Sequence, residues 1–255
     1  MAKPVPAPAP HWVIACGDFL FKYRNYLFPA VFVVMAITAA GGPSISERTD
    51  QILDLAGVIL AALGQALRAL VIGLAYIKRG GLNKKVYASD LVTTGIFASC
   101  RNPLYVGNAM ILAGLLLICN MPWAYLIAGG FFVFAYWCIV RTEETFLLKK
   151  FGEQYAEYCR NVNRWVPDLG RVITAMRTMS FNWRRVLMKD YSTIVTWVLG
   201  AIALETYEEA LWGTGPTRGL LIGFAIQVGA VLCCSATVRW LKKSGRLTET
   251  AQPSA

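Results

Sequence analysis

No charged residue occurs among the 39 residues that separate Arg101 from Arg141. As a single α-helix this segment would be about 58 Å long, about twice the hydrocarbon thickness of a bilayer. The sequence Asn120-Met121-Pro122 divides it, because proline disfavours helical backbone at the preceding residue and lacks the amide hydrogen that continues a helix. The segment therefore predicts a tight hairpin of two membrane-spanning helices, over about residues 103–119 and 122–140.

Further apolar segments predict more membrane helices over residues 26–42, 55–77 and 219–238. A weaker one follows Asp190 and must be short, or tilted, or extend past Glu205 toward Trp212. The chain is 56% hydrophobic and only 16% charged, whereas soluble domains average about 25% charged residues. We therefore expect an all-α integral membrane protein with about six transmembrane helices. In the last span, Gly219 and Gly223 have the spacing that permits close helix contact.

The 25 Lys and Arg residues outnumber the 15 Asp and Glu residues, giving a net charge of +10. Nearly all of the basic residues lie before the first span, between the second and third, between the fourth and fifth, or after the last. This distribution follows the positive-inside rule, so it argues against nucleic acid as a partner. We expect an inner (plasma) membrane protein with both termini in the cytoplasm.

These features divide the chain into six expected segments. They are an N-terminal tail and interfacial segment (1–25), spans one and two (26–80), a core with the hairpin and polar motifs (81–167), a cytoplasmic linker (168–190), spans five and six (191–240) and a disordered tail (241–255). Seven cysteines without CxxC spacing, and His11 as the sole histidine, argue against a metal site, a disulfide framework or histidine-based catalysis.

Polar motifs flank the hairpin on both sides. Upstream, Gly95 precedes Arg101-Asn102-Pro103-Leu-Tyr105-Val-Gly107; downstream lie Arg141-Thr-Glu143-Glu144, then Phe151-Gly152-Glu-Gln-Tyr155-Ala-Glu-Tyr158, then Arg164 and Pro167. Each piece alone is compatible with an ordinary helix start, helix exit or interfacial face. A tight hairpin nevertheless returns both motifs to the same membrane face, so we expect a polar pocket at the cytoplasmic mouth of the hairpin.

In this order, from about Gly95 to Pro167, the motifs resemble the isoprenylcysteine carboxyl methyltransferase and phospholipid methyltransferase superfamily of membrane enzymes. The shared pattern is Arg-His/Asn-Pro-x-Tyr-x-Gly, a hydrophobic hairpin, Arg-x-Glu-Glu, Phe-Gly-x-x-Tyr-x-x-Tyr, and an Arg followed by Pro. Asn102 stands where the eukaryotic enzymes have histidine, and the chain continues into two further spans where several relatives end.

The resemblance implies that the cofactor is S-adenosylmethionine. Carboxylates suit its ribose hydroxyls and ammonium group, arginine suits its carboxylate, and aromatic faces suit its sulfonium. By resemblance, the residues expected to bind the cofactor are Val92, Gly95, Asn102, Pro103, Tyr105, Gly107, Glu143, Glu144 and Tyr155.

The expected acceptor is a lipid or an isoprenoid-linked, prenylated molecule that enters sideways from the membrane. A carboxylate acceptor needs no general base, only cations to orient it, and Arg101, Arg141 and Arg164 are the expected catalytic residues. Arg68 is an intramembrane charge in span two: either its side chain extends to the membrane surface or has a role within the helix, or it faces inward and binds substrate. Three alternatives stay open: an N-methyltransferase of the phosphatidylethanolamine type, an NADPH-dependent sterol-type reductase, and a non-enzymatic membrane partner.

Overall fold

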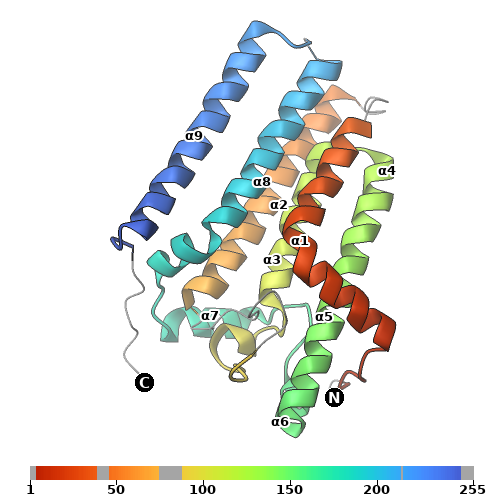
Figure 1. Ribbon diagram of the computed structural model, residues 1–255, viewed down its shortest axis with the longest axis vertical. Helices are drawn as coiled ribbons and strands as arrows, with labels where there is room; N and C mark the ends of the chain where they lie inside the picture. The colour runs from red at the N-terminus through yellow and green to blue at the C-terminus, as the bar shows by residue number, and fades with distance from the viewer. Residues whose placement is uncertain (1–3, 39–45, 75–87, 214, 248–255) are drawn as a thin grey trace.

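The computed structural model describes residues 4–38, 46–74, 88–213 and 215–247, and over these ranges the chain is helical and has no β-strand. The helices form one elongated bundle (Figure 1). In chain order they are α1 (His11–Thr38), α2 (Glu47–Leu74), η1 (Gly95–Ala98), α3 (Pro103–Cys119), α4 (Pro122–Ala124), η2 (Tyr125–Gly129), α5 (Gly130–Phe151), α6 (Glu153–Asn161), α7 (Leu169–Thr178), α8 (Trp183–Trp212) and α9 (Arg218–Lys243).

The predicted hairpin is confirmed at its turn. Helix α3 ends at Cys119, and Asn120 adopts a left-handed conformation with φ of 41°. Pro122 then begins α4, and α4, η2 and α5 form one apolar helix of 30 residues from Pro122 to Phe151. The second arm is longer than residues 122–140, so it carries the downstream glutamates on its last turns.

Helices α2 and α3 pack closely along their length because glycines face each other. A Cβ atom at Gly57 would lie 2.6 Å from the Gly114 carbonyl oxygen, and one at Gly64 would lie 2.6 Å from the Gly107 carbonyl oxygen. Such distances leave no room for a side chain, so these positions set the separation of the two helices.

Four helices in the described part of the chain are long and apolar enough to cross a membrane. They are Glu47–Leu74, Pro122–Phe151, Trp183–Leu211 and Arg218–Lys243, and α3 is a shorter apolar helix. This confirms the all-α membrane fold, and the count of six spans stays a prediction. Residues 39–42 and 75–77, at the ends of the first two predicted spans, lie outside the described residues.

Helix α1 begins at His11, well before the predicted first span. Its early turns pack against α5, where Val13 and Leu20 join Cys138 and Ile139 in a buried apolar cluster. The expected interfacial segment is therefore the first part of a longer helix, which bends across the bundle in Figure 1.

Helix α8 resolves the weak fifth span, because it runs for 30 residues and continues past Glu205 to Trp212. Helix α9 packs against α8 on the outside of the bundle (Figure 1) and has no buried residue. Within the described chain, no atom lies within 4 Å of a Cβ at Gly223. The spacing of Gly219 and Gly223 therefore makes no close helix contact within the described part of the chain. Of the predicted C-terminal tail, residues 248–255 lie outside the described residues.

Candidate functional site

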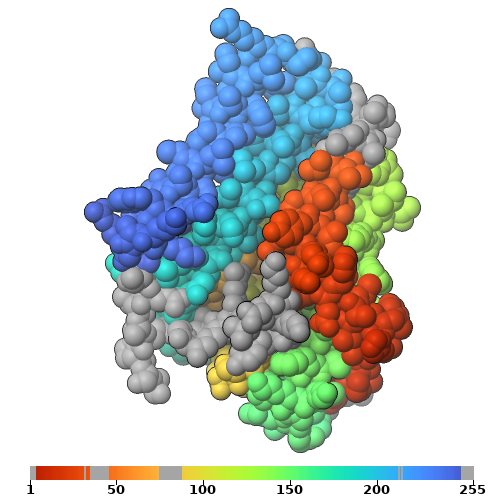
Figure 2. Space-filling model, viewed as in Figure 1, coloured from red at the N-terminus to blue at the C-terminus, as the bar shows by residue number. Residues whose placement is uncertain are grey.

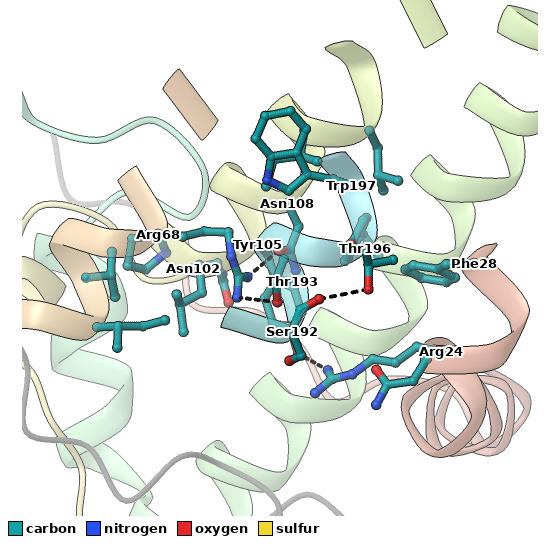
Figure 3. Close-up of a pocket in the computed structure, with 18 of the residues that line it drawn as sticks. Arg24, Phe28, Arg68, Asn102, Tyr105, Asn108, Ser192, Thr193, Thr196 and Trp197 are labelled. Carbon is teal, nitrogen blue, oxygen red and sulfur yellow. Dashed lines mark hydrogen bonds between the residues drawn. The ribbon is translucent and has the colours of Figure 1, made fainter. Parts of the chain in front are cut away.

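A cavity of about 940 Å³ lies among α1, α2, α3, α5, α6 and α8. Its polar part is at the end of the bundle where α3 begins, and includes Arg101, Asn102 and Tyr105. Figure 3 shows Arg24 and Phe28 of α1 on one side of this cavity, facing α8 on the other. The volume is near the top of the range of about 300–1,000 Å³ typical of small-molecule sites.

The loop before α3 and the loop after α6 are joined by hydrogen bonds. The upstream and downstream sequence motifs therefore lie next to each other. The Arg101 amide donates to the Asn163 carbonyl at 2.8 Å. The Asn102 side chain donates to the Arg164 carbonyl at 3.2 Å, and the Tyr158 hydroxyl donates to the Phe97 carbonyl at 2.8 Å. Segments about 60 residues apart in sequence are therefore fixed against each other at one end of the hairpin.

Glu144 is buried between two arginines. Arg101 Nη1 lies 3.2 Å from its Oε1 atom, and Arg164 Nη2 lies 2.8 Å from its Oε2 atom. Burial alone would lower the pKa of Arg101, but the neighbouring carboxylate of Glu144, with Cys159 and Tyr155, raises it overall. Arg101 and Arg164 are thus held by a carboxylate of the protein itself.

Glu143, one residue earlier, faces a different partner. The Tyr105 hydroxyl donates a hydrogen bond of 2.6 Å to Glu143 Oε1, and Arg24 Nη1 donates to the Tyr105 oxygen at 3.4 Å. All three side chains line the cavity. This arrangement connects α1, α3 and α5 across the polar part of the cavity.

Tyr155 closes the cavity from α6 and is only 2% exposed. Burial raises its pKa, and the nearby Glu144 carboxylate raises it further. Burial also raises the pKa of Tyr158. Both phenols stay protonated at neutral pH and present aromatic faces and neutral hydroxyls.

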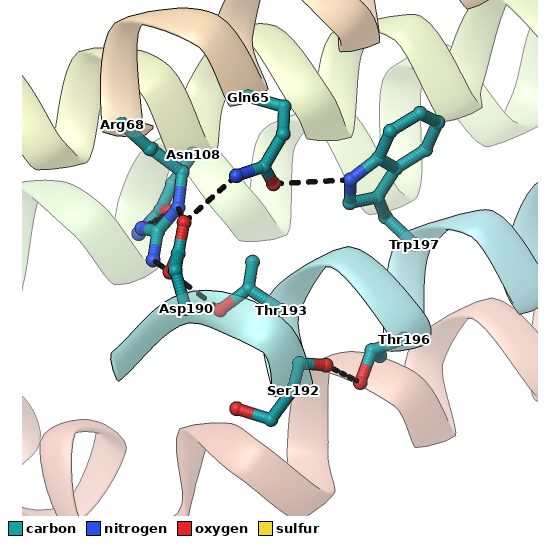
Figure 4. Close-up of polar contacts among 8 residues, drawn as sticks. All are labelled: Gln65, Arg68, Asn108, Asp190, Ser192, Thr193, Thr196 and Trp197. Carbon is teal, nitrogen blue, oxygen red and sulfur yellow. Dashed lines mark hydrogen bonds and ion pairs between the residues drawn. The ribbon is translucent and has the colours of Figure 1, made fainter. Parts of the chain in front are cut away.

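Arg68 projects into the bundle from α2 and is held by α3 and α8 (Figure 4). Its Nε donates to Asp190 Oδ2 at 3.2 Å, its Nη2 forms an ion pair with Asp190 Oδ1, and its Nη1 donates to Asn108 Oδ1. Nη2 also donates to the Thr193 hydroxyl at 3.2 Å. The intramembrane arginine is therefore compensated by a buried carboxylate, and it lines the cavity as expected.

Gln65 extends this network along α8. It donates to Asp190 Oδ2 at 2.8 Å and accepts from the Trp197 indole nitrogen at 3.1 Å, as Figure 4 shows. Asp190 and Trp197 have no signal in the local sequence that identifies them as site residues, because their partners lie more than 120 residues away.

Several residues expected at the site do not line the cavity in the described structure: Val92, Gly95, Gly107 and Arg141. Gly107 has a packing role, because a Cβ there would lie 2.6 Å from Arg68 Cγ. Gly95 has a positive φ of 61°, which glycine adopts without strain. The expected residues that do line it are Arg68, Arg101, Asn102, Pro103, Tyr105, Glu143, Glu144 and Tyr155. Arg164 reaches the site through Glu144.

Other polar lining residues were not expected from the sequence. They include Asn108 of α3 and, from α1 and α8, Arg24, Asn25, Arg185, Lys189, Ser192, Thr193, Thr196 and Trp197. The signal that identifies those on α8 is helical spacing: the residues recur at intervals of three or four along one face.

A separate group of carboxylates lies at the opposite end of the bundle. Ligand atoms of Asp50, Asp54 and Glu208 lie within 4.8 Å of one another, and the Asn120 amide donates to Asp50 Oδ1 at 2.8 Å. This group is distinct from the polar part of the cavity.

Comparison with known proteins identifies the chain as a membrane methyltransferase, and its helices are apolar enough to cross a membrane. Residues 53–154 match the model of the phospholipid methyltransferase family. The chain therefore belongs to the superfamily of phospholipid and isoprenylcysteine methyltransferases. The matched segment comprises most of α2, all of α3 and α5, and the start of α6, but neither α1 nor α8.

Three curated relatives are similar to the chain. The cobalt-zinc-cadmium resistance protein CzcN of Cupriavidus metallidurans is 33% identical over 61% of this chain and 68% of its own length. The nickel-cobalt-cadmium resistance protein NccN of Alcaligenes xylosoxydans xylosoxydans is 27% identical over 65% and 72%. Protein-S-isoprenylcysteine O-methyltransferase of Rattus norvegicus is 30% identical over 45% of this chain and 41% of its own length. No solved structure matches the chain.

Proposed function

We propose that the protein transfers a methyl group from S-adenosylmethionine to a carboxylate on a lipid or isoprenoid-linked acceptor. The observation that carries this proposal is the continuity of the cavity. One part is lined by Tyr105, Glu143 and Glu144, and the same cavity continues to apolar residues such as Leu112 and Leu204. The cavity can therefore hold a polar cofactor and an apolar acceptor next to each other.

The polar residues suit S-adenosylmethionine by their chemistry. Glu143 and Glu144 offer carboxylates for ribose hydroxyls and an ammonium group, and Tyr155 offers an aromatic face. Among the described residues, the buried Nε atom of Arg101 has no hydrogen-bond partner, so it is a donor available for a carboxylate. Asn102 and Tyr105 complete the proposed cofactor site, while Arg164 positions Glu144.

When bound, S-adenosylmethionine supplies an electrophilic methyl group, and methyl transfer is an in-line displacement. The protein has to hold the acceptor in line and exclude water. Tyr105, held by Glu143 and Arg24, is a fixed side of the polar part of the cavity. A carboxylate acceptor arrives ionised, so no side chain has to remove a proton from it.

The direct test is equilibrium binding of S-adenosylmethionine to the detergent-solubilised protein. Glu144→Gln should weaken binding at least about tenfold, because a charged hydrogen-bond partner is lost, whereas Glu153→Gln, at an exposed carboxylate of α6, should not. Absence of binding to the wild type overturns the proposal. Protection by NADPH instead would favour the reductase, and binding of neither would favour a non-enzymatic membrane partner.

The second candidate is N-methylation of a phosphatidylethanolamine-type amine. The hydrogen bond from Tyr105 to Glu143 favours it, since an amine acceptor must lose a proton and this pair offers a carboxylate to receive it. Incubation with methyl-labelled cofactor and a membrane lipid extract separates the two candidates. A methyl ester releases labelled methanol in mild alkali, whereas an N-methyl group is retained.

We further propose that α1 and α3 complete six spans, with both termini and the polar part of the cavity on the cytoplasmic side of an inner membrane. The distribution of basic residues supports this orientation. Reporter fusions at each terminus that are active only in the cytoplasm should both be active. An inactive fusion at either terminus would reverse the assignment.

The names of the two bacterial relatives connect them with resistance to divalent metals. We propose that the methylated product contributes to metal tolerance in cells that contain this protein. A deletion strain should be more sensitive to cadmium, zinc or cobalt salts, and the wild type, but not the Glu144→Gln variant, should restore growth. Equal restoration by both would separate tolerance from methyl transfer.

A further inference from the structure

One face of α8 lines the cavity, and the polarity of its side chains changes along the helix. Its first turns present charged and hydroxyl side chains to the cavity, and its later turns present small or apolar ones. In order, the lining residues are Arg185, Lys189, Ser192, Thr193, Thr196 and Trp197, followed by Gly200, Ala203, Leu204 and Tyr207. Spacings of three and four keep them on one face. This gradient matches a molecule with a charged head and an apolar chain.

Helix α1 repeats the same gradient on the facing side of the cavity. Arg24 and Asn25 lie beside the polar part, and Phe28, Pro29 and Val33 follow toward the apolar part. Figure 3 shows Arg24 reaching toward the side of α8 that carries Ser192. The polar residues of α1 therefore face the polar residues of α8, and the apolar residues of the two helices also face each other. Neither helix belongs to the segment that matches the family.

The cavity opens to the surface between α1 and α8. Several of its lining residues are also exposed, and all of these lie on the two helices: Asn25, Val33, Lys189, Ser192, Thr196 and Ala203. Figure 2 shows α1 and α8 beside each other on one face of the molecule. With α1 spanning the membrane as proposed above, an opening between α1 and α8 admits a molecule sideways from the lipid phase.

The charges that line the cavity are mostly positive. Arg68 is paired with Asp190, and Arg101 shares the Glu144 carboxylate with Arg164. Arg24, Arg185 and Lys189 also line the cavity, and Glu143 is the further lining carboxylate. Three of the lining cations, Arg24, Arg185 and Lys189, therefore belong to α1 and α8.

We propose that the space between α1 and α8 binds an anionic amphiphile with one apolar chain, and that Arg24 and Lys189 bind its carboxylate or phosphate. This inference rests on the proposed function, because the amphiphile is the methyl acceptor. Arg24 contacts Tyr105, which contacts Glu143. An anion at Arg24 is thereby placed beside the proposed cofactor site, with its chain directed toward Leu204 and Tyr207.

Native mass spectrometry of the full chain, released from nonionic detergent, tests the proposal without requiring turnover. The probes share a 14-carbon chain and differ in the head group: tetradecanoate, tetradecyl phosphate and tetradecyltrimethylammonium. S-adenosylmethionine is added in a separate arm. At least one anionic probe should form adducts about ten times more readily than the cation, and the comparison of the two anions identifies the preferred head.

Arg24→Gln and Lys189→Gln should each lower the anionic adduct about tenfold, the effect expected of one charged hydrogen bond. Arg24→Lys should retain most of it, and Lys243→Gln, an exposed charge on α9, should have no effect. The S-adenosylmethionine adduct should persist in the Lys189 and Lys243 variants, which shows that they are folded.

Two results overturn the inference. One is equal binding of anionic and cationic probes to the wild type, and the other is loss of anion binding in none of the variants. A wild type that binds the anions but not S-adenosylmethionine would contradict the proposed function and leave the anion site standing. Binding of S-adenosylmethionine without any preference for anionic probes would contradict the anion site and leave the proposed function standing.

Discussion

Arg68 of α2 and Asp190 of α8 form an ion pair in which the side chains are 5% and 0% exposed. The two residues are 122 positions apart. Arg68 lies in the segment that matches the family, and Asp190 lies beyond it. The pair therefore attaches the additional helix α8 to the family core and fixes the face of α8 that lines the cavity.

Removal of one partner of this pair should be strongly destabilising. Asp190→Ala leaves a buried guanidinium without its carboxylate, and we expect a loss of about 3–5 kcal/mol in the free energy of unfolding. The double substitution Arg68→Met and Asp190→Leu removes both charges and should recover most of that loss. Thermal unfolding of the solubilised protein measures both. An equal loss in the single and double variants would contradict this account, and Asp168→Asn, in an exposed pair, is the control.

The hairpin and the arrangement of its flanking motifs were predictable because their signals are local. A charge-free segment too long for one membrane helix, with Pro122 near its centre, must fold into two helices joined by a turn. The structure has this turn at Asn120. Arg101 and Glu144 meet for the same reason, since a tight hairpin returns its two ends to one place.

The contributions of α1 and α8 to the site were not predictable in the same way. Arg24 and Asp190 are ordinary charges near the ends of apolar segments, and their partners are distant in sequence. The packing of α9 was not predictable for a related reason. The spacing of Gly219 and Gly223 matches a known packing pattern, but spacing alone does not tell which helices meet.

A larger residue at a glycine between α2 and α3 should destabilise the fold. A Cβ at Gly114 would lie 2.4 Å from the Gly57 carbonyl oxygen, so Gly114→Ala must push the helices apart. We expect a loss of about 1–3 kcal/mol, typical of overpacked sites. Gly223→Ala on α9, where an added Cβ has no neighbour within 4 Å among the described residues, should have little effect in the same thermal unfolding measurement. A similar shift for both variants would count against close packing of α2 and α3.

Tyr105→Phe should impair methyl transfer while the fold persists. The substitution keeps the ring and removes the hydroxyl that donates to Glu143. Loss of a hydrogen bond to a charged group is worth about 1.5–3 kcal/mol, so we expect kcat/KM to fall about 10- to 100-fold. Tyr26→Phe, at an exposed ring of α1, is the matched control. An unchanged kcat/KM for Tyr105→Phe would remove this hydroxyl from the proposed site.

The cysteines near the site should react slowly. Cys100 and Cys159 are buried, and burial raises the pKa of both thiols despite the nearby Arg101. Because the thiolate is the reactive form, alkylation by iodoacetamide should need a higher pH than for an ordinary thiol. It should become fast after denaturation, when access and the usual pKa are restored. Peptide mapping of alkylation between pH 7 and pH 9 measures this, and rapid labelling of native Cys159 at pH 7 would contradict it.

Gly200 should determine how long an apolar chain the cavity accepts. A Cβ at Gly200 would lie 3.9 Å from Leu115 Cδ1, an ordinary van der Waals distance, so α8 tolerates a larger residue there. Gly200 and Leu115 both line the apolar part of the cavity. The rest of a leucine side chain at position 200 would occupy that part. Gly200→Leu should therefore weaken binding of tetradecanoate by tenfold or more, since each buried methylene contributes about 0.8 kcal/mol.

Octanoate has six carbon atoms fewer than tetradecanoate, so its binding should be much less affected by Gly200→Leu. Gly229→Leu on α9, where a Cβ has no neighbour within 4 Å in the described part of the chain, should alter the binding of neither probe. The ratio of the two affinities is the measurement, because a general loss of stability would lower both together. An equal loss for the short and long chains would show that the chain does not lie along α8, even if the anion site at Arg24 is correct.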